Sequence, residues 1–72
     1  MRANTEMSPI HANAAPVRAY AQWISETKGE PYVVITIPQG SAAYRMGYRF
    51  TSIPESEQPH YVANGATVVP AE

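Results

Sequence analysis

Residues 32–50 read YVVITIPQGSAAYRMGYRF, and this stretch decides the fold. Residues 32–37 are β-branched or aromatic, and residues 42–50 alternate between larger apolar and other side chains, both of which are typical of strands. The intervening Pro38-Gln39-Gly40-Ser41 suits a tight turn. The pattern therefore predicts an antiparallel β-hairpin over residues 32–50.

A tight turn at residues 38–41 also sets the register of this hairpin. Pairing Ile37 with Ala42 places Ile35 opposite Tyr44 and Val33 opposite Met46. Because side chains alternate along a strand, one face is predicted to form the core: Val33, Ile35, Ile37, Tyr44, Met46, Tyr48 and Phe50. The other face is predicted to carry Tyr32, Val34, Thr36, Arg45, Gly47 and Arg49, with Gly47 opposite Tyr32.

A helix is predicted over residues 14–28. Asn13 is a good N-cap residue, Pro16 fits the first turn, and Gly29 with Pro31 ends the helix. Apolar residues recur at helical spacing and form one stripe: Val17, Tyr20, Ala21 and Ile24. We expect this stripe to pack on the apolar face of the hairpin, with Trp23 on its flank.

A second, shorter hairpin is predicted over residues 60–69, because Asn64-Gly65 is a strong two-residue turn signal. Residues 1–13 are polar and show no period, so they are expected to form a flexible tail, as are residues 70–72. The expected fold is α+β. One N-terminal helix packs on a small antiparallel sheet of two successive hairpins, in a single domain over residues 14–69.

Composition bounds the class of protein. The 72 residues allow one domain, and five basic against six acidic residues give a net charge of −1. A nucleic-acid-binding protein usually has a clear basic excess. The absence of cysteine fits a reducing, cytoplasmic location, and the sequence shows neither a secretory signal pattern nor an apolar run long enough to span a membrane.

The residues needed for catalysis, metal binding or a cofactor are missing. There is no aspartate or cysteine, and the two histidines, His11 and His60, are far apart without neighbouring ligands. Gly40-Ser41 lacks the pattern and the following helix expected of a nucleophile elbow. No carboxylate pair has apolar surroundings, and the glycines form no phosphate-binding loop. We therefore expect no enzymatic activity, no metal and no cofactor.

The remaining candidate for function is a partner-binding surface. The outward face of the central hairpin would carry Tyr32, Thr36, Arg45 and Arg49, and Trp23 would extend it if exposed. Arginine, tyrosine and tryptophan are common at the centres of protein interfaces. The simpler alternative is that Arg45 and Arg49 only keep an open sheet face solvated, and that Trp23 belongs to the edge of the core.

The function expected from these observations is that of a small non-enzymatic protein-binding module. Regulators and inhibitors of larger proteins, of the accessory kind found in phage and mobile elements, share its small size and lack of catalytic groups. One alternative is a nucleic-acid-binding module that uses Tyr32, Arg45 and Arg49, with Arg18 as a further cation. Another is a homodimer joined through strand edges.

Overall fold

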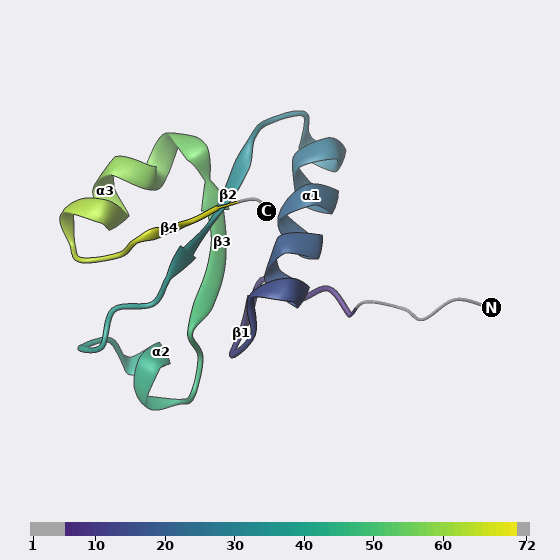
Figure 1. Cartoon of the computed structure of the whole chain (residues 1–72). Helices are drawn as coiled ribbons and strands as arrows, with labels where there is room; N and C mark the ends of the chain where they lie inside the picture. Colours follow the sequence, from purple (N-terminus) through teal and green to yellow (C-terminus); the bar gives the residue numbers. More distant parts are fainter. Residues whose placement is uncertain (1–5, 71–72) are drawn as a thin grey trace.

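The computed structural model describes residues 6–70 (Figure 1). Its elements along the chain are β1 (Ile10–His11), α1 (Ala14–Lys28), β2 (Tyr32–Thr36), α2 (Ala42–Arg45), β3 (Phe50–Pro54), a 3₁₀ turn (Glu55–Glu57), α3 (Gln58–Ala63) and β4 (Val68–Val69). Within the described residues the strands form one antiparallel sheet in the order β1-β3-β2-β4. Helix α1 packs on β2 and β3. The expected α+β class, with an N-terminal helix on an antiparallel sheet, is confirmed.

Helix α1 has the predicted bounds. Asn13 occupies the N-cap position with extended backbone angles, although its side chain makes no capping hydrogen bond. Gly29 adopts the left-handed conformation, with a φ of 70°, and its N–H donates to the carbonyl oxygen of Ser25 at 2.9 Å. The buried residues of the helix lie along the predicted stripe and are Val17, Ala21 and Ile24.

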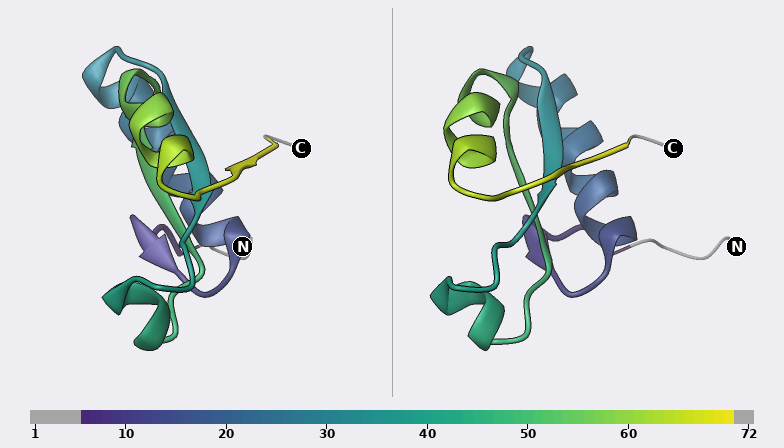
Figure 2. Two further views of the ribbon diagram at one scale, coloured as in Figure 1. Left: turned by 90° about the vertical axis from the view of Figure 1, so that its left-hand side faces the viewer. Right: turned by 60° about the vertical axis from the view of Figure 1, so that its left-hand side comes forward.

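The predicted hairpin over residues 32–50 is wrong in its second strand. The partner of β2 is β3, which begins only at Phe50, so Val33 lies opposite Ile53 and Ile35 lies opposite Thr51. Met46 and Tyr44, the predicted partners, belong to the connection between the two strands. This connection projects from one end of the sheet (Figure 2).

Local capping explains why residues 42–45 form a helical turn. The turn at Pro38 is present, since the Ser41 N–H donates to the Pro38 carbonyl at 3.1 Å. The Ser41 side chain then caps α2 by accepting a hydrogen bond from the Tyr44 N–H at 3.3 Å. The two alanines that follow Ser41 favour a helix over a strand. As a result Met46, expected in the core, is 71% exposed.

In the predicted second hairpin, the first strand is replaced by the helix α3, and only Val68–Val69 of the second is a strand. Asn64 ends α3, and Gly65 follows it with a φ of 103°. The N–H of Gly65 donates to the Val62 carbonyl and the N–H of Ala66 to the Tyr61 carbonyl, which is the Schellman pattern of a helix C-terminus. Asn64-Gly65 therefore terminates a helix. The short β4 that follows pairs with β2.

Both faces of β2 are buried, whereas only one was predicted to be. Val34, expected on the outward face, is 5% exposed and packs against Val17 and Ala21 of α1. Ile35 points to the opposite face, where it packs with Ile53 and Ala66. The reason is that α1 and α3 lie on opposite sides of the sheet (Figure 1), so neither face of β2 is left in water.

Part of the predicted N-terminal tail belongs to the sheet. Ile10 pairs with Thr51 and His11 with Phe50, so these two residues form an edge strand. The Ser8 hydroxyl donates to the Ile10 carbonyl and accepts from the Ile10 N–H at 3.4 Å. Residues 1–5 and 71–72, which complete the predicted flexible ends, lie outside the described residues. Over residues 6–70 no helix has the length and apolar character needed to cross a bilayer.

Candidate functional site

The residues predicted to bind a partner do not share one face. Tyr32 and Thr36 lie at the two ends of β2, whereas Arg45 lies in α2 and Arg49 just before β3. Trp23 lies on α1 and is 46% exposed, with its ring centroid 5.8 Å from that of Tyr20. The predicted surface depended on the wrong hairpin register, so it is not assembled.

Arg49 is engaged within the chain. Its guanidinium carbon lies 3.7 Å from the centroid of the Tyr44 ring, and Nη1 donates to the carbonyl oxygens of Tyr44 and Tyr48 at 2.9 Å each. These contacts hold the connection that contains α2. Arg45, by contrast, is exposed on that helix.

Thr36 holds β4 against β2. Its N–H donates to the Thr67 carbonyl at 2.8 Å, and its Oγ1 accepts from the Thr67 N–H at 2.9 Å. A side-chain acceptor here extends the short β2–β4 ladder by one residue. The structure therefore gives Thr36 a role in positioning β4.

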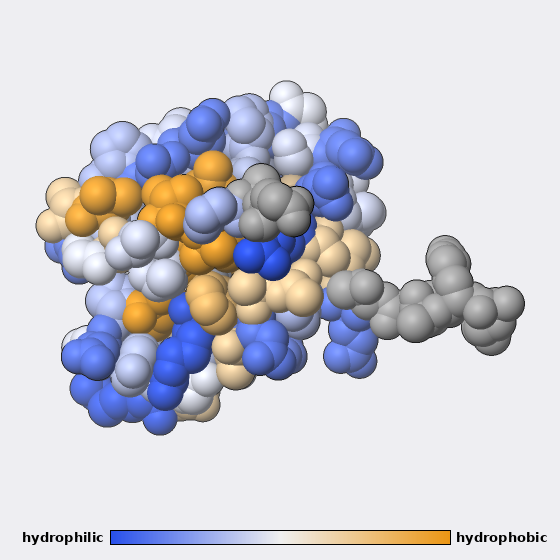
Figure 3. Space-filling model, in the orientation of Figure 1, coloured by the Kyte–Doolittle hydropathy of each residue, from blue (hydrophilic) through white to orange (hydrophobic). Residues whose placement is uncertain are grey.

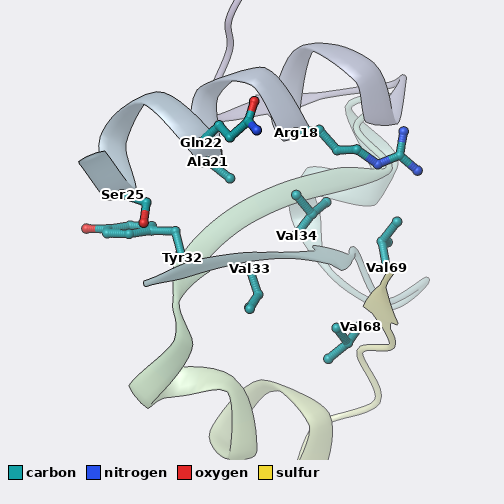
Figure 4. Close-up of a pocket in the computed structure, with 9 residues that line it drawn as sticks. All are labelled: Arg18, Ala21, Gln22, Ser25, Tyr32, Val33, Val34, Val68 and Val69. Carbon is teal, nitrogen blue, oxygen red and sulfur yellow. The ribbon is translucent and has the colours of Figure 1, made fainter. Parts of the chain in front are cut away.

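A groove of about 380 Å³ lies between α1, β2 and β4 (Figure 4). We call it the edge groove and define it by its lining residues: Arg18, Ala21, Gln22, Ser25, Tyr32, Val33, Val34, Val68 and Val69. Of the residues predicted to bind a partner, it contains Tyr32. Arg18, considered above as a further cation for nucleic acid, also belongs to it.

The edge groove follows the side of β2 that β4 leaves partly uncovered. Val34 points toward α1 and Val33 points away from it, yet both line the groove (Figure 4). A hollow that reaches both faces of a strand must lie at its edge. Strand β4 pairs with Val34 and Ile35 of β2 and with no other residue of that strand. Among residues 6–70, nothing pairs with the N-terminal part of this edge, which we call the open edge.

Backbone alternation identifies the groups on the open edge. The N–H of Thr36 points to β4, since it donates to Thr67, while the N–H of Ile37 points the other way and donates to Arg49. Backbone groups alternate between the two neighbours along a central strand. Tyr32 is four residues before Thr36, so its N–H and C=O point to the β4 side, beyond the end of the β2–β4 pairing.

The wall of the edge groove is apolar on the sheet side and polar on the helix side. Four valines come from β2 and β4, and Arg18, Gln22 and Ser25 come from α1. None of the lining residues, all of which lie within the described range 6–70, is acidic. Helical spacing groups Arg18, Gln22 and Ser25 on one face of α1, and that signal was visible in the sequence. The four valines, which we call the valine wall, could not be predicted to lie together, because their position depends on the pairing of β4 with β2.

Two other parts of the described surface expose fewer polar or charged groups with which to bind a partner. A smaller hollow of about 190 Å³ lies on the opposite side of the sheet, between Ile35, Pro38, Ala43 and Tyr61. Apolar surface gathers over α3 and β4 (Figure 3), where Val62 is exposed and Val68 half-buried. Among residues 6–70, no three acidic or histidine side chains come together in a way that could hold a metal ion.

Comparison with known proteins adds no relative from which a role could be transferred. No protein-family model matches the chain, no curated protein matches its sequence, and no solved structure matches its fold. The edge groove must therefore be interpreted from its own geometry.

Proposed function

We propose that the chain is a small non-enzymatic protein-binding module that holds an extended segment of a partner protein in the edge groove. The observation that carries this proposal is the position of the groove on the open edge of β2, beside β4. A strand edge is the surface to which an extended peptide adds by backbone hydrogen bonds. Regulation or inhibition of the partner would follow from occupation of that segment.

The backbone of Tyr32 supplies the first contact. Its N–H and C=O face the groove, so an added strand can form two hydrogen bonds with this residue. Each such bond contributes about 0.5–1.5 kcal/mol in net terms. Two bonds alone give weak binding, so side-chain contacts must supply the rest.

The valine wall supplies the side-chain contact. An apolar side chain of the partner can pack against Val34 and Val69, which lie on the face of the sheet that α1 covers. Burial of a valine- or leucine-sized side chain contributes about 1.5–3 kcal/mol. The Tyr32 ring, which is half-buried at the far end of the groove, adds an aromatic surface of the kind that is frequent at interfaces.

The alternative of nucleic-acid binding has less support. It needed Tyr32, Arg45 and Arg49 on one surface, and Arg49 instead contacts Tyr44 and two carbonyl oxygens. Among the described residues the edge groove contains one cation, Arg18, and the chain has a net charge of −1. Steep salt dependence, which phosphate binding requires, is not expected from one arginine.

Homodimerisation through strand edges remains a second proposal. At β1 the Ser8 hydroxyl already bonds both outward backbone groups of Ile10, which disfavours pairing there. Within residues 6–70, β4 and the open edge of β2 are the strand edges that a second copy could pair with. Light scattering over a range of protein concentrations tests this: a monomer at high concentration would remove it.

A random peptide library displayed on phage tests peptide binding directly. Ser25→Trp fills the groove, because Ser25 lines it, whereas Thr27→Trp places the same ring on an exposed part of α1 outside it. We expect the wild-type protein and Thr27→Trp to enrich and bind the same peptides, and Ser25→Trp to lose them. No enrichment by the folded wild-type protein, or equal binding by both variants, would contradict the proposal.

A further inference from the structure

We infer that the partner segment carries an acidic side chain, aspartate or glutamate, that pairs with Arg18 in the edge groove. This inference rests on the proposed function and adds the chemistry of the partner to it. The carrying observation is the charge of the groove: among the lining residues within 6–70, Arg18 is the one ionic side chain and none is acidic.

Arg18 has unused hydrogen-bonding capacity. Within residues 6–70 its guanidinium makes one hydrogen bond, from Nε to the Pro70 carbonyl oxygen at 3.4 Å. That distance is long for an N–H···O bond. The two terminal nitrogens carry four further N–H donors in a planar arrangement that suits a carboxylate. A carboxylate in the groove would therefore meet an arginine able to donate two parallel hydrogen bonds.

The geometry of α1 gives the spacing expected in the partner. Ser25 lies beside Tyr32 at one end of the groove and Arg18 lies near Val69 at the other (Figure 4). These two helix positions are seven residues apart, which corresponds to about 10 Å along the axis. An extended chain covers that length in about three residues. We therefore expect the acidic residue roughly two to four positions from the residue that contacts Tyr32.

The polar residue between these two ends, Gln22, is compatible with the same extended acidic segment. Gln22 lies one helical turn from Arg18 and one from Ser25, on the same rim of the groove. Its amide can donate to, or accept from, the backbone of an extended segment. The rim therefore offers one charged contact at one end and neutral contacts elsewhere. This arrangement selects for one acidic residue in the segment.

The test is selection from one random peptide library with three proteins: the wild type, Arg18→Gln and Arg18→Glu. We expect the wild type to enrich peptides with an acidic residue, Arg18→Gln to lose that preference, and Arg18→Glu to prefer Lys or Arg. For an acidic peptide from the first selection, Arg18→Gln should weaken binding by about fivefold, as expected for a part-exposed ion pair. Arg45→Gln, which removes an exposed arginine outside the groove, should leave binding unchanged.

The outcomes separate this inference from the proposed function. Peptides that bind in the groove without an acidic residue, or bind Arg18→Gln equally well, would overturn the inference and leave the proposed function standing. Absence of any enrichment by the wild type would overturn both. The peptides are joined to the coat protein at their C-terminus, so a selected carboxylate is a side chain.

Two further results would assign the groove to a different occupant. A parallel library with free C-termini that enriches peptides only when the terminus is free would assign Arg18 to a terminal carboxylate. Dimerisation that Ser25→Trp abolishes and Thr27→Trp preserves would assign the groove to a second copy of this chain. Either result contradicts the inference.

Discussion

The guanidinium of Arg49 lies over the ring of Tyr44, with its central carbon 3.7 Å from the ring centroid. The same side chain donates through Nη1 to the carbonyl oxygens of Tyr44 and Tyr48. These contacts close the connection between β2 and β3 from its C-terminal end, while Ser41 caps α2 at the other. A segment of mostly exposed or half-buried residues thereby obtains a defined conformation without a core of its own.

Substitution of Arg49 should therefore loosen this connection. Arg49→Met keeps an unbranched stem but removes the cation and both hydrogen bonds. We expect a loss of about 1–3 kcal/mol in the free energy of unfolding, measured by urea denaturation. Arg45→Met is the matched control, because Arg45 is exposed, and should change the stability by less than about 0.5 kcal/mol. Equal effects of the two substitutions would argue against a clamp at Arg49.

The two-sided burial of β2 makes a second prediction. Ile35 is 1% exposed, whereas Met46, once expected to share its core face, is 71% exposed. Ile35→Val should lower the free energy of unfolding by about 0.5–1.5 kcal/mol, and Met46→Ala should change it by less than about 0.5 kcal/mol. Denaturation of the two variants under identical conditions decides between this fold and the hairpin expected from alternation. A larger loss for Met46→Ala would favour the hairpin.

The sequence predicted α1 correctly because its signals are local. Asn13, Gly29 and Pro31 mark its ends within a few residues, and the stripe from Val17 to Ile24 repeats within the helix itself. The prediction of a second strand over residues 42–50 was wrong, because the same residues are also compatible with a capped helical turn. Ser41 with two alanines stabilises that turn, and β2 then pairs with a strand further along the chain.

The candidate site was also predictable only in part, because some of its residues follow from local patterns and others depend on pairing between distant segments. Tyr32 and the helix rim of the edge groove follow from local spacing along β2 and α1. The valine wall requires that β4, at the end of the chain, pair with β2, more than thirty positions earlier in sequence. A two-residue strand has almost no sequence signature, and Asn64-Gly65 pointed to a hairpin turn where the chain ends a helix.

The docking of β4 gives a third prediction. Thr36→Val keeps the shape of the side chain but removes Oγ1, the acceptor of the Thr67 N–H. We expect faster hydrogen exchange at the Thr67 amide and weaker peptide binding, because β4 carries Val68 and Val69 of the groove wall. Thr27→Val, at an exposed position of α1, should change neither. Unchanged exchange at Thr67 in Thr36→Val would show that Oγ1 does not hold the strand.

The end of α3 gives the last prediction. Gly65 has a φ of 103°, a conformation that costs an L-residue roughly 1–2 kcal/mol, although no atom within 4 Å would clash with an added Cβ. Gly65→Ala should therefore lower the free energy of unfolding by about 1 kcal/mol through backbone strain alone. Gly40 also has open space around it but no positive φ, so Gly40→Ala should be neutral or slightly stabilising. Thermal unfolding of the two variants measures the difference. If the two variants unfold at the same temperature, the chain does not require a positive φ at Gly65. That result would contradict both the observed helix end and the hairpin turn expected at Asn64-Gly65, because each needs a positive φ at this glycine.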